Sequence, residues 1–278
     1  MNVEIATEAA PGHENEDFAG ANSHGIVLID GAGLSDVDDG GCIHGVAWYA
    51  RRLGHAVLAE LAHVSADGSD LRQALKNAIS TVADQHSDTC DLAHPGTPGA
   101  TVVMAHFGAE VLSYLVLADS TLVVATGDGI QVVTDDREAA VGATLRTTMD
   151  QFTGGTAAHD AARCDFVAAL RAHRNVTGGF WVAAAEPAAA AEAIVGDVPL
   201  DEIRAVALLS DGATRIVDRF GLASWGDILQ TLTSRGPGEL IRRNREAERS
   251  DPTCTRWPRG KVYDDATVLA AYPCHRNV

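Results

Sequence analysis

Acidic side chains stand where apolar runs begin or end, at four places spread over almost the whole chain. Asp30 and Asp211 each close a run and are each followed by Gly, Asp264 directly precedes a run, and Glu16-Asp17 lies near the start. Hard divalent cations such as Mg²⁺ and Mn²⁺ prefer oxygen ligands, and a pair of them needs several carboxylates that converge on one point. Each Asp-Gly pair alone also suits a strand-to-turn corner. Together the four places favour a metal centre.

The elements that must position these acids are predicted from hydrophobic periodicity. Continuous apolar runs predict strands at 26–30, 205–209 and 266–272. Apolar residues at three- and four-residue steps predict helices at 42–63, 70–83, 222–233 and 239–249, with helical pieces at 157–173 and 187–194. Short β-type runs at 101–107, 111–118, 121–125 and 130–133 predict an antiparallel meander. In that meander, Asp119-Ser120 is interpreted as a hairpin turn in preference to a metal ligand.

The composition is that of a globular protein, with 46% hydrophobic residues and a formal charge of −17. This charge argues against binding to nucleic acid or to an anionic membrane surface, because both are polyanions. The first residues lack a basic segment followed by a long apolar run, so no signal peptide is expected. No repeat or linker divides the chain, and residues 1–278 are predicted to form a single domain.

Cysteine usage predicts reduced thiols and a cytoplasmic location. Five cysteines, an odd number, occur without C-x-x-C spacing, at positions 42, 90, 164, 254 and 274. Cys42 and His44 stand one residue apart, but we recognise no second Cys/His pair at ligand spacing. We therefore expect no zinc site at Cys42 and His44.

Six motifs in order carry a resemblance to a known family. They are Asn15-Glu16-Asp17, Ile29-Asp30-Gly31-Ala32-Gly33, Gly99-Ala100-Thr101, Ala118-Asp119-Ser120, Ser210-Asp211-Gly212 and Asp264-Asp265-Ala266-Thr267. Each motif alone is weak, but six in this order over nearly the full chain are fairly specific. On these motifs the sequence resembles the metal-dependent protein phosphatases, the protein phosphatase 2C-like or PPM family, of the bacterial type.

The resemblance implies an α+β fold, a four-layer α-β-β-α sandwich of two antiparallel sheets flanked by helices. It also implies a centre of two Mn²⁺ or Mg²⁺ ions at one end of the sheets. By motif position, Asp30 bridges the two ions and the carbonyl oxygen of Gly31 joins it. Asp211 and Asp264 hold one of the ions.

Three further acids complete the implied ligand set. Glu16 and Asp17 act directly or through bound water, and Asp119 fits a looser third metal site that Asp211 also uses. In this chemistry, water activated by the two metal ions attacks the phosphate in line, and no covalent intermediate is required. The implied partner is a phosphorylated protein, with phosphoserine or phosphothreonine as substrate.

The chain departs from the family pattern at three places. Gly12 stands where an Arg usually grips the substrate phosphate, and Ala32 stands where the eukaryotic branch has a His. Arg215 occupies a position where an acid often assists the third metal. A guanidinium matches the geometry of a phosphate, so Arg215 is predicted to replace the missing Arg. The predicted catalytic residues are therefore Asp30, Asp211 and Arg215.

Two other functions stay open at this point. The missing Arg makes a phosphatase of a small phospho-metabolite plausible, with the same fold and metals. A non-catalytic binding module that uses the fold as a scaffold is the third hypothesis, and the intact metal acids speak against it. The sequence does not predict an oligomeric state.

Overall fold

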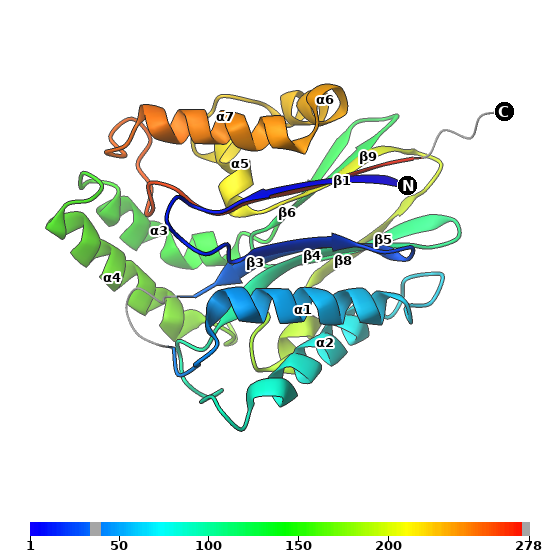
Figure 1. Ribbon diagram of the computed structural model, residues 1–278, viewed down its shortest axis with the longest axis horizontal. Coiled ribbons are helices and arrows are strands. Elements are labelled where there is room, and N and C mark those ends of the chain that lie inside the picture. Colours follow the sequence, from blue (N-terminus) through cyan, green and yellow to red (C-terminus); the bar gives the residue numbers. More distant parts are fainter. Residues whose placement is uncertain (34–39, 274–278) are drawn as a thin grey trace.

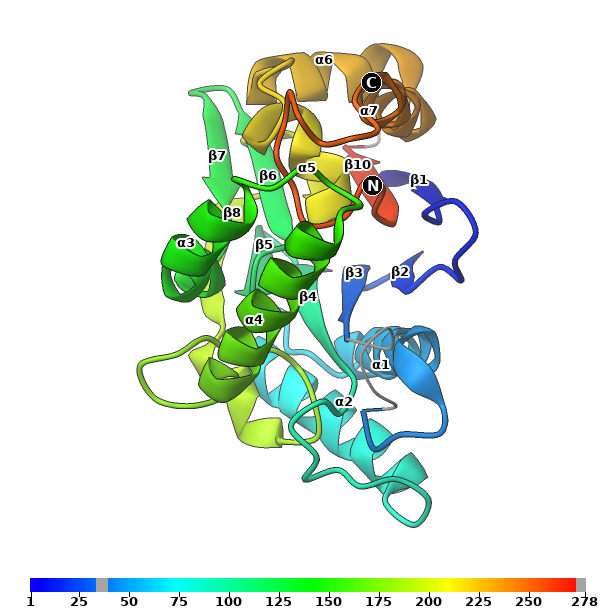
Figure 2. The same cartoon turned by 90° about the vertical axis from the view of Figure 1, so that its left-hand side faces the viewer.

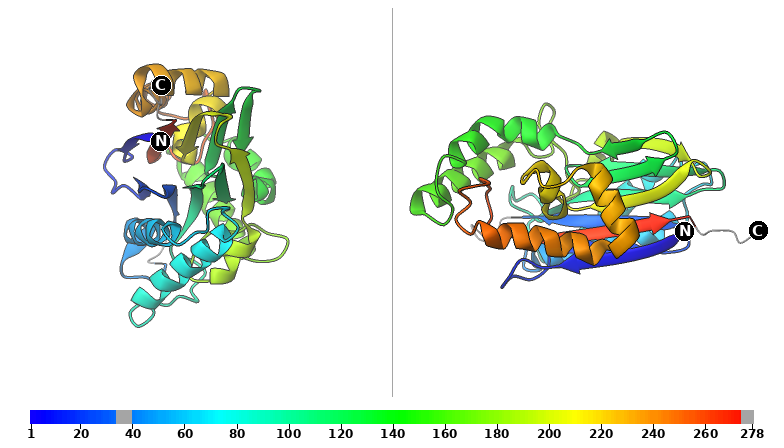
Figure 3. Two further views of the ribbon diagram at one scale, coloured as in Figure 1. Left: turned by 90° about the vertical axis from the view of Figure 1, so that its right-hand side faces the viewer. Right: turned by 90° about the horizontal axis from the view of Figure 1, so that it is seen from above.

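Two antiparallel sheets of five strands each face one another, and helices cover their outer faces (Figure 1). This arrangement is seen in a computed structural model that describes residues 1–33 and 40–273. Helices lie above and below the pair of sheets, which gives four layers (Figure 3). The predicted α-β-β-α sandwich is confirmed.

The first sheet has the strand order β1-β10-β9-β6-β7. Its two central strands pair in antiparallel fashion, with Val268 opposite Leu209. The strands are β1 (Asn2–Glu8), β6 (Thr121–Thr126), β7 (Ile130–Val133), β9 (Ile203–Leu209) and β10 (Ala266–Tyr272).

The second sheet has the strand order β2-β3-β4-β5-β8. Its strands are β2 (Asp17–Ala21), β3 (Gly25–Ala32), β4 (Gly99–Phe107), β5 (Val111–Leu117) and β8 (Ile194–Pro199). Ile26, Val27, Leu28 and Ile29 of β3 are all fully buried. The strand therefore has no polar alternation, because one face meets the other sheet and the opposite face meets helices.

The helices fall into three groups. Helices α1 and α2 pack on the second sheet, helices α5 to α7 pack on the first, and α3 and α4 pack on each other beyond one end of the sheets (Figure 2). Their bounds are α1 (Gly45–Leu61), α2 (Leu71–His86), α3 (Arg137–Met149), α4 (Ala157–His173), α5 (Asp211–Asp218), α6 (Trp225–Arg235) and α7 (Pro237–Ser250), with a 3₁₀ helix η1 (Pro187–Glu192).

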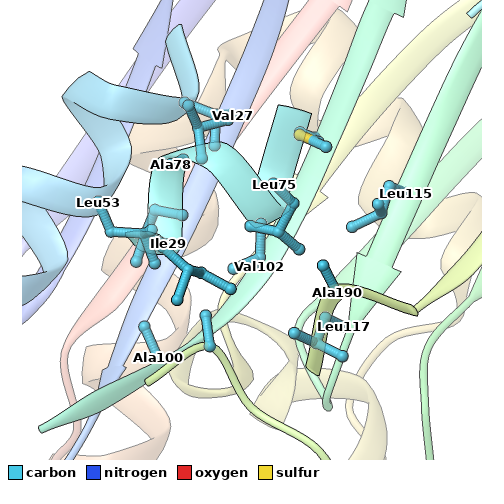
Figure 4. Packing of buried hydrophobic residues seen from close by; sticks show 14 of the residues in the cluster. Val27, Ile29, Leu53, Leu75, Ala78, Ala100, Val102, Leu115, Leu117 and Ala190 are labelled. Carbon is cyan, nitrogen blue, oxygen red and sulfur yellow. The ribbon is translucent and has the colours of Figure 1, made fainter. Parts of the chain in front are cut away.

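Three apolar clusters correspond to the three spaces between the four layers. Side chains of α1 and α2 meet those of β3, β4 and β5 in one of them, with Leu53, Leu75 and Ile29 close together (Figure 4). A second cluster fills the space between the sheets, and a third lies under α5, α6 and α7. The burial of these clusters holds the strand ends in fixed positions.

The predicted meander is wrong. The pairs β4–β5 and β6–β7 are hairpins as expected, but β5 belongs to the second sheet and β6 to the first. Asp119-Ser120 is therefore a crossing between the sheets, and Ala118 before it has a positive φ of 66°. Sequence reasoning did not distinguish this crossing from a hairpin, because both need a sharp turn between two β-type runs.

Other differences concern element ends and weakly patterned segments. Helix α1 begins at Gly45, three residues later than predicted, and Ile43 is 77% exposed. Strands β2 and β8 and helices α3 and α5 were not predicted. Cys42, Cys90, Cys164 and Cys254 are free thiols, as expected, whereas Cys274 lies outside the described residues.

The burial of two leucines predicts how much each contributes to the free energy of unfolding. Leu208 of β9 is fully buried between the sheets, whereas Leu222 is 46% exposed. We expect Leu208→Ala to lower the free energy of unfolding by about 2–5 kcal/mol. We expect Leu222→Ala to change it by less than about 0.5 kcal/mol. Urea denaturation of both variants measures the difference, and equal losses would contradict the packing described.

Candidate metal centre

The predicted acids of the second sheet lie side by side at one end of two neighbouring strands. Asp17 is the first residue of β2 and pairs with Asp30 near the end of β3. Gly31, the next residue, pairs with Ala100 at the start of β4 and donates its backbone N–H to the carbonyl oxygen of Glu16 over 3.1 Å. The antiparallel register therefore brings the motifs at 15–17 and 29–33 together.

The acids of the first sheet reach the same end from the other side. Asp211 is the first residue of α5, two residues after the end of β9, and Asp264 stands two residues before β10. The backbone N–H of Asp211 donates to Oδ2 of Asp30 over 3.3 Å, which joins the two sheets at this point. Residues 181 positions apart in the chain thus share one site.

A cavity of about 250 Å³ opens at this junction. Six of the predicted site residues line it: Asp30, Gly31, Asp119, Asp211, Arg215 and Asp264. Glu16 lines an adjoining cavity of about 550 Å³, which shares Asp264 and Lys261 with the first. Asp17 is buried beside Asp30 and lines neither cavity. The structure therefore brings the predicted residues to one region, with Glu16 and Asp17 at its edge.

Neither Asp-Gly pair is a plain turn. Asp30-Gly31 lies within β3, and Asp211-Gly212 begins α5. A β-carbon on Gly31 would lie 2.6 Å from the carbonyl oxygen of Glu16, and one on Gly212 would lie 1.9 Å from that of Asp265. Both positions need Gly because another backbone segment approaches closely. The glycines thus allow the acidic segments to pack together.

Burial and like charges raise the carboxyl pKa values here. Burial raises the pKa of Asp30 well above its usual value, and the charges of Asp17, Asp211, Asp119 and Asp264 raise it further. Burial raises the pKa of Asp17 to about 7, with Asp265 and Asp211 adding to the shift. Keeping such a cluster of buried carboxylates ionised costs free energy unless positive charge offsets it.

Asp119 joins this group, contrary to its interpretation as a hairpin turn. Its carboxylate belongs to the cavity lining. Burial raises its pKa, and the charges of Glu138 and Asp211 act in the same direction. The crossing between the sheets therefore delivers an acid to the cavity.

The donor set fits hard divalent cations. Both carboxylate oxygens of Asp17 are buried without a hydrogen-bond partner. Among the described residues, no three of these carboxylates have oxygens all within 4.8 Å of one another. The fit therefore rests on the chemistry of the donors that line the cavity. Carboxylate oxygens match Mn²⁺ or Mg²⁺.

Asp264 differs from the other acids because cations contact it. Arg215 donates to Oδ2 of Asp264 over 2.5 Å and to Oε1 of the fully buried Glu248 over 2.9 Å. Nζ of Lys261 lies 3.2 Å from Oδ1 of Asp264. Burial opposes ionisation of Asp264, but Arg215 and Lys261 outweigh it and hold the pKa of this carboxyl below its usual value.

Sequence reasoning missed several residues of the site. Glu138 and Arg146 of α3 and Lys261 line the cavity. Asp265 accepts hydrogen bonds from the backbone N–H groups of Ala10 and Glu16, each over 2.7 Å. Helix α3 has almost no amphipathic pattern that could have revealed its residues, whereas Asp265 stood in the quoted motif beside Asp264.

A comparison with protein families matches residues 9–242 to protein phosphatase 2C. The match covers most of the chain and includes most of the acidic motifs. The chain belongs to the protein phosphatase 2C family. Membership confirms the predicted enzyme class, a metal-dependent protein phosphatase and hence a hydrolase, and with it the expected use of divalent Mn²⁺ or Mg²⁺. No curated protein sequence matches the chain.

Solved structures with the same fold include bacterial phosphatases. The serine/threonine phosphatase Stp1 from Staphylococcus aureus is 15% identical with a TM-score of 0.60, covering 98% of this chain and 94% of its own. PstP/Ppp from Mycobacterium tuberculosis is 19% identical with a TM-score of 0.59, covering 99% of each chain. The catalytic domain of PstP, solved with 2 manganese ions, is 19% identical with a TM-score of 0.54 and covers 98% of this chain and 97% of its own. At these identities the likeness establishes the fold.

Helices long and apolar enough to cross a bilayer are absent from residues 1–33 and 40–273.

The raised pKa values predict how pH affects the metal-free protein. Between about pH 4 and pH 7 Asp17 binds more protons in the folded chain than in the unfolded chain, so its contribution to the free energy of unfolding falls as pH rises. We expect Asp17→Asn, which removes a group with a pKa of about 7, to stabilise the metal-free protein at about pH 8 by at least 1 kcal/mol. At about pH 5 the effect disappears, because Asp17 is already protonated. Urea denaturation in EDTA at both pH values measures this.

The exposed Asp128→Asn is the matched control and leaves the free energy of unfolding unchanged at both pH values. The quantity to compare is the free energy of unfolding of Asp17→Asn minus that of the wild type. A lower value of this difference at pH 8 than at pH 5 would contradict the expectation.

Proposed function

We propose that this chain, as a single catalytic domain over residues 1–278, hydrolyses phosphoserine and phosphothreonine in proteins at the cavity between the sheet ends. The observation that carries the proposal is the meeting of Asp30 from one sheet with Asp211 and Asp264 from the other around one cavity. Family membership supports the reaction class. The distribution of carboxylates supports the metal requirement.

Each acid has a proposed role. Asp30, the carbonyl oxygen of Gly31, Asp211 and Asp264 would hold the pair of ions. Glu16 and Asp17 would contribute from the adjoining side, and Asp119 with Asp211 would hold a third, looser ion. When bound, Mn²⁺ or Mg²⁺ supplies Lewis acidity that activates water and offsets the charge of a phosphate ester.

The surrounding residues fix the orientation of these ligands. Arg215 and Lys261 contact both oxygens of Asp264, so this carboxylate cannot rotate freely. The segment before Asp17 is held by Asp265, which accepts from the N–H of Glu16. Ligands held on strands and by such contacts keep the geometry that phosphate transfer requires.

The phosphate needs a cation in place of the Arg absent at Gly12. Arg215 was predicted for this role, but its guanidinium already bonds Asp264 and Glu248. Arg146 also lines the cavity, and its guanidinium carbon lies 4.8 Å from the ring centre of Phe166. Burial raises the pKa values of Asp119 and Asp211, and the charge of Arg146 partly opposes this shift, which supports a position close to the acids. Arg146 is therefore the preferred phosphate contact and Arg215 a positioning residue.

The adjoining cavity of about 550 Å³ favours a peptide substrate. It is lined by the loop with His13 and Glu14, by His44 beside α1 and by His159 and Arg163 of α4. A small phosphate ester would not need this second space. The free thiols of this chain are typical of a cytoplasmic protein, which supports that location for it.

Substitution of the acids tests the proposed reaction. We expect Asp30→Asn and Asp211→Asn to lower kcat for a phosphothreonine peptide at least about 100-fold, because the ligands that position the ions are lost. EDTA abolishes wild-type activity and Mn²⁺ or Mg²⁺ restores it, while the exposed Asp128→Asn keeps full activity. Activity that survives chelation contradicts the metal mechanism.

The choice of substrate separates the remaining possibilities. Phosphoserine and phosphothreonine peptides are expected to give a higher kcat/KM than small phosphate esters in the same assay. The reverse order would favour a phospho-metabolite as substrate. A metal-loaded protein that turns over neither the peptides nor p-nitrophenyl phosphate would favour a binding module.

Two arginine variants test the phosphate contact. We expect Arg146→Ala to raise KM about 10-fold or more, the size of a lost charged hydrogen bond, with the melting temperature unchanged. We expect Arg215→Ala to lower the stability by about 3 kcal/mol, because Asp264 and Glu248 lose a buried partner, and to lower kcat more than it raises KM. Steady-state kinetics and thermal denaturation of both variants give these values. A raised KM in Arg215→Ala alone, with unchanged stability, would restore the role predicted from the sequence.

A further inference from the structure

Four sulfur and nitrogen side chains converge outside the acidic cavity, at the point where two helices meet. Cys42 and His44 directly precede α1, His86 is the last residue of α2, and Cys90 follows four residues later. The start of α1 and the end of α2 lie at the same end of this helix pair (Figure 1). Sequence reasoning did not recognise His86 and Cys90 as the second pair, although their spacing suits metal ligands.

The distances within this group match a tetrahedral metal site. One ligand atom from each residue lies within 4.8 Å of all the others. The two sulfur atoms are 3.3 Å apart, and Nδ1 of His44 lies 3.3 Å from Sγ of Cys90 and 3.9 Å from Sγ of Cys42. Nδ1 of His86 lies 3.7 Å from Sγ of Cys42. A tetrahedral Zn²⁺ with two Cys and two His ligands needs separations of roughly 3.3–3.8 Å.

Burying the polar atoms of these four side chains costs free energy unless a further partner binds them. Cys42 and His86 are 5% and 2% exposed. The ring nitrogen of His86 that faces the cluster, Nδ1, has the thiol of Cys42 as its neighbour at 3.7 Å. Thiol hydrogen bonds are weak and do not compensate for buried imidazole nitrogens. His44 and Cys90 are partly exposed, which leaves a path for an ion to enter.

The surroundings hold the four ligands in place. The backbone N–H of Cys90 donates to the carbonyl oxygen of His86 over 3.0 Å, and that of Asp91 donates to the carbonyl oxygen of Gly41 over 2.8 Å. The ring of Trp48 stacks on that of His44 with 4.3 Å between centroids. The two ligand pairs are therefore oriented toward each other by contacts that do not depend on the ligand atoms themselves.

We propose that Cys42, His44, His86 and Cys90 bind one Zn²⁺ ion that joins the start of α1 to the end of α2. Two thiolates balance the charge of the ion, so the buried complex is neutral. Thiolate and imidazole ligands select Zn²⁺, whereas the carboxylates of the catalytic cavity select Mn²⁺ or Mg²⁺. The role of this site is structural, because all four tetrahedral positions are filled by the protein.

Metal analysis of the full-length chain tests the site. The protein is produced with zinc present, purified with a reductant, and exchanged into Mg²⁺ buffer. We expect about one zinc per chain in the wild type and in Asp30→Asn, and near zero in Cys42→Ser and Cys90→Ser. The exposed Cys164→Ser is the matched thiol control and keeps its zinc. Zinc that is retained in Cys90→Ser but lost in Asp30→Asn would overturn the proposal.

Spectroscopy of the wild type covers the case in which the Cys variants do not fold. We expect X-ray absorption at the zinc edge to give two sulfur ligands at about 2.3 Å and two nitrogen ligands at about 2.0 Å. Cobalt-exchanged protein should show the visible bands of a tetrahedral thiolate site, and Cys90→His, which substitutes another zinc ligand, should retain zinc and fold. A zinc shell of oxygen and nitrogen alone, or a Cys42–Cys90 disulfide in the reduced preparation, would overturn the site.

Discussion

The crowding of carboxylates at one buried end of the sandwich is the constraint on which the rest of the structure depends. Asp30, Asp17 and Asp211 lie where burial and their mutual repulsion both disfavour the charged form. An isolated cluster of this kind would separate or remain protonated. The strands prevent separation, since β3 and β9 are fixed by apolar clusters on both of their faces. Core packing therefore supplies the free energy that holds a charge arrangement suited to divalent cations.

A chain of ion pairs extends this arrangement into the layer of α7. Glu248, fully buried, accepts from Arg215 over 2.9 Å and from Arg245 over 2.7 Å. Arg245 also contacts Glu8 at the end of β1 over 3.1 Å, and Arg215 contacts Asp264 over 2.5 Å. Buried ion pairs contribute little net stability, but losing one partner is costly. The network therefore fixes the position of Asp264 relative to β1 and α7, more than it stabilises the fold.

The sequence predicted those parts of the fold that are encoded locally. The long apolar run before Asp30 reflects a strand buried on both faces, and the periodic pattern of α1 reflects a helix buried on one face. The acids at the strand ends were assigned from the family motifs. The crossing at Ala118 was not predictable, because the same turn residues serve a hairpin and a passage to the other sheet. Arg215 was predicted to contact phosphate, and the partners that bind its guanidinium lie 33 and 49 residues away. Helix α3, which carries Glu138 and Arg146, lacks an apolar stripe because only its Gly142 and Met149 are buried.

The proposed zinc site and the acidic centre are connected through the first turn of α1. A β-carbon on Gly31 would lie 2.6 Å from Cγ1 of Val46, so the helix start packs directly against the backbone that presents the Gly31 carbonyl oxygen. Cys42 and His44 immediately precede this turn, and joining them to the end of α2 restricts how the helix can move. A zinc ion at this point would thus preserve the geometry of a site that binds a different metal. The carboxylates select Mn²⁺ or Mg²⁺, and the thiolates and imidazoles select Zn²⁺. The two sites therefore hold different metals although their supporting segments touch.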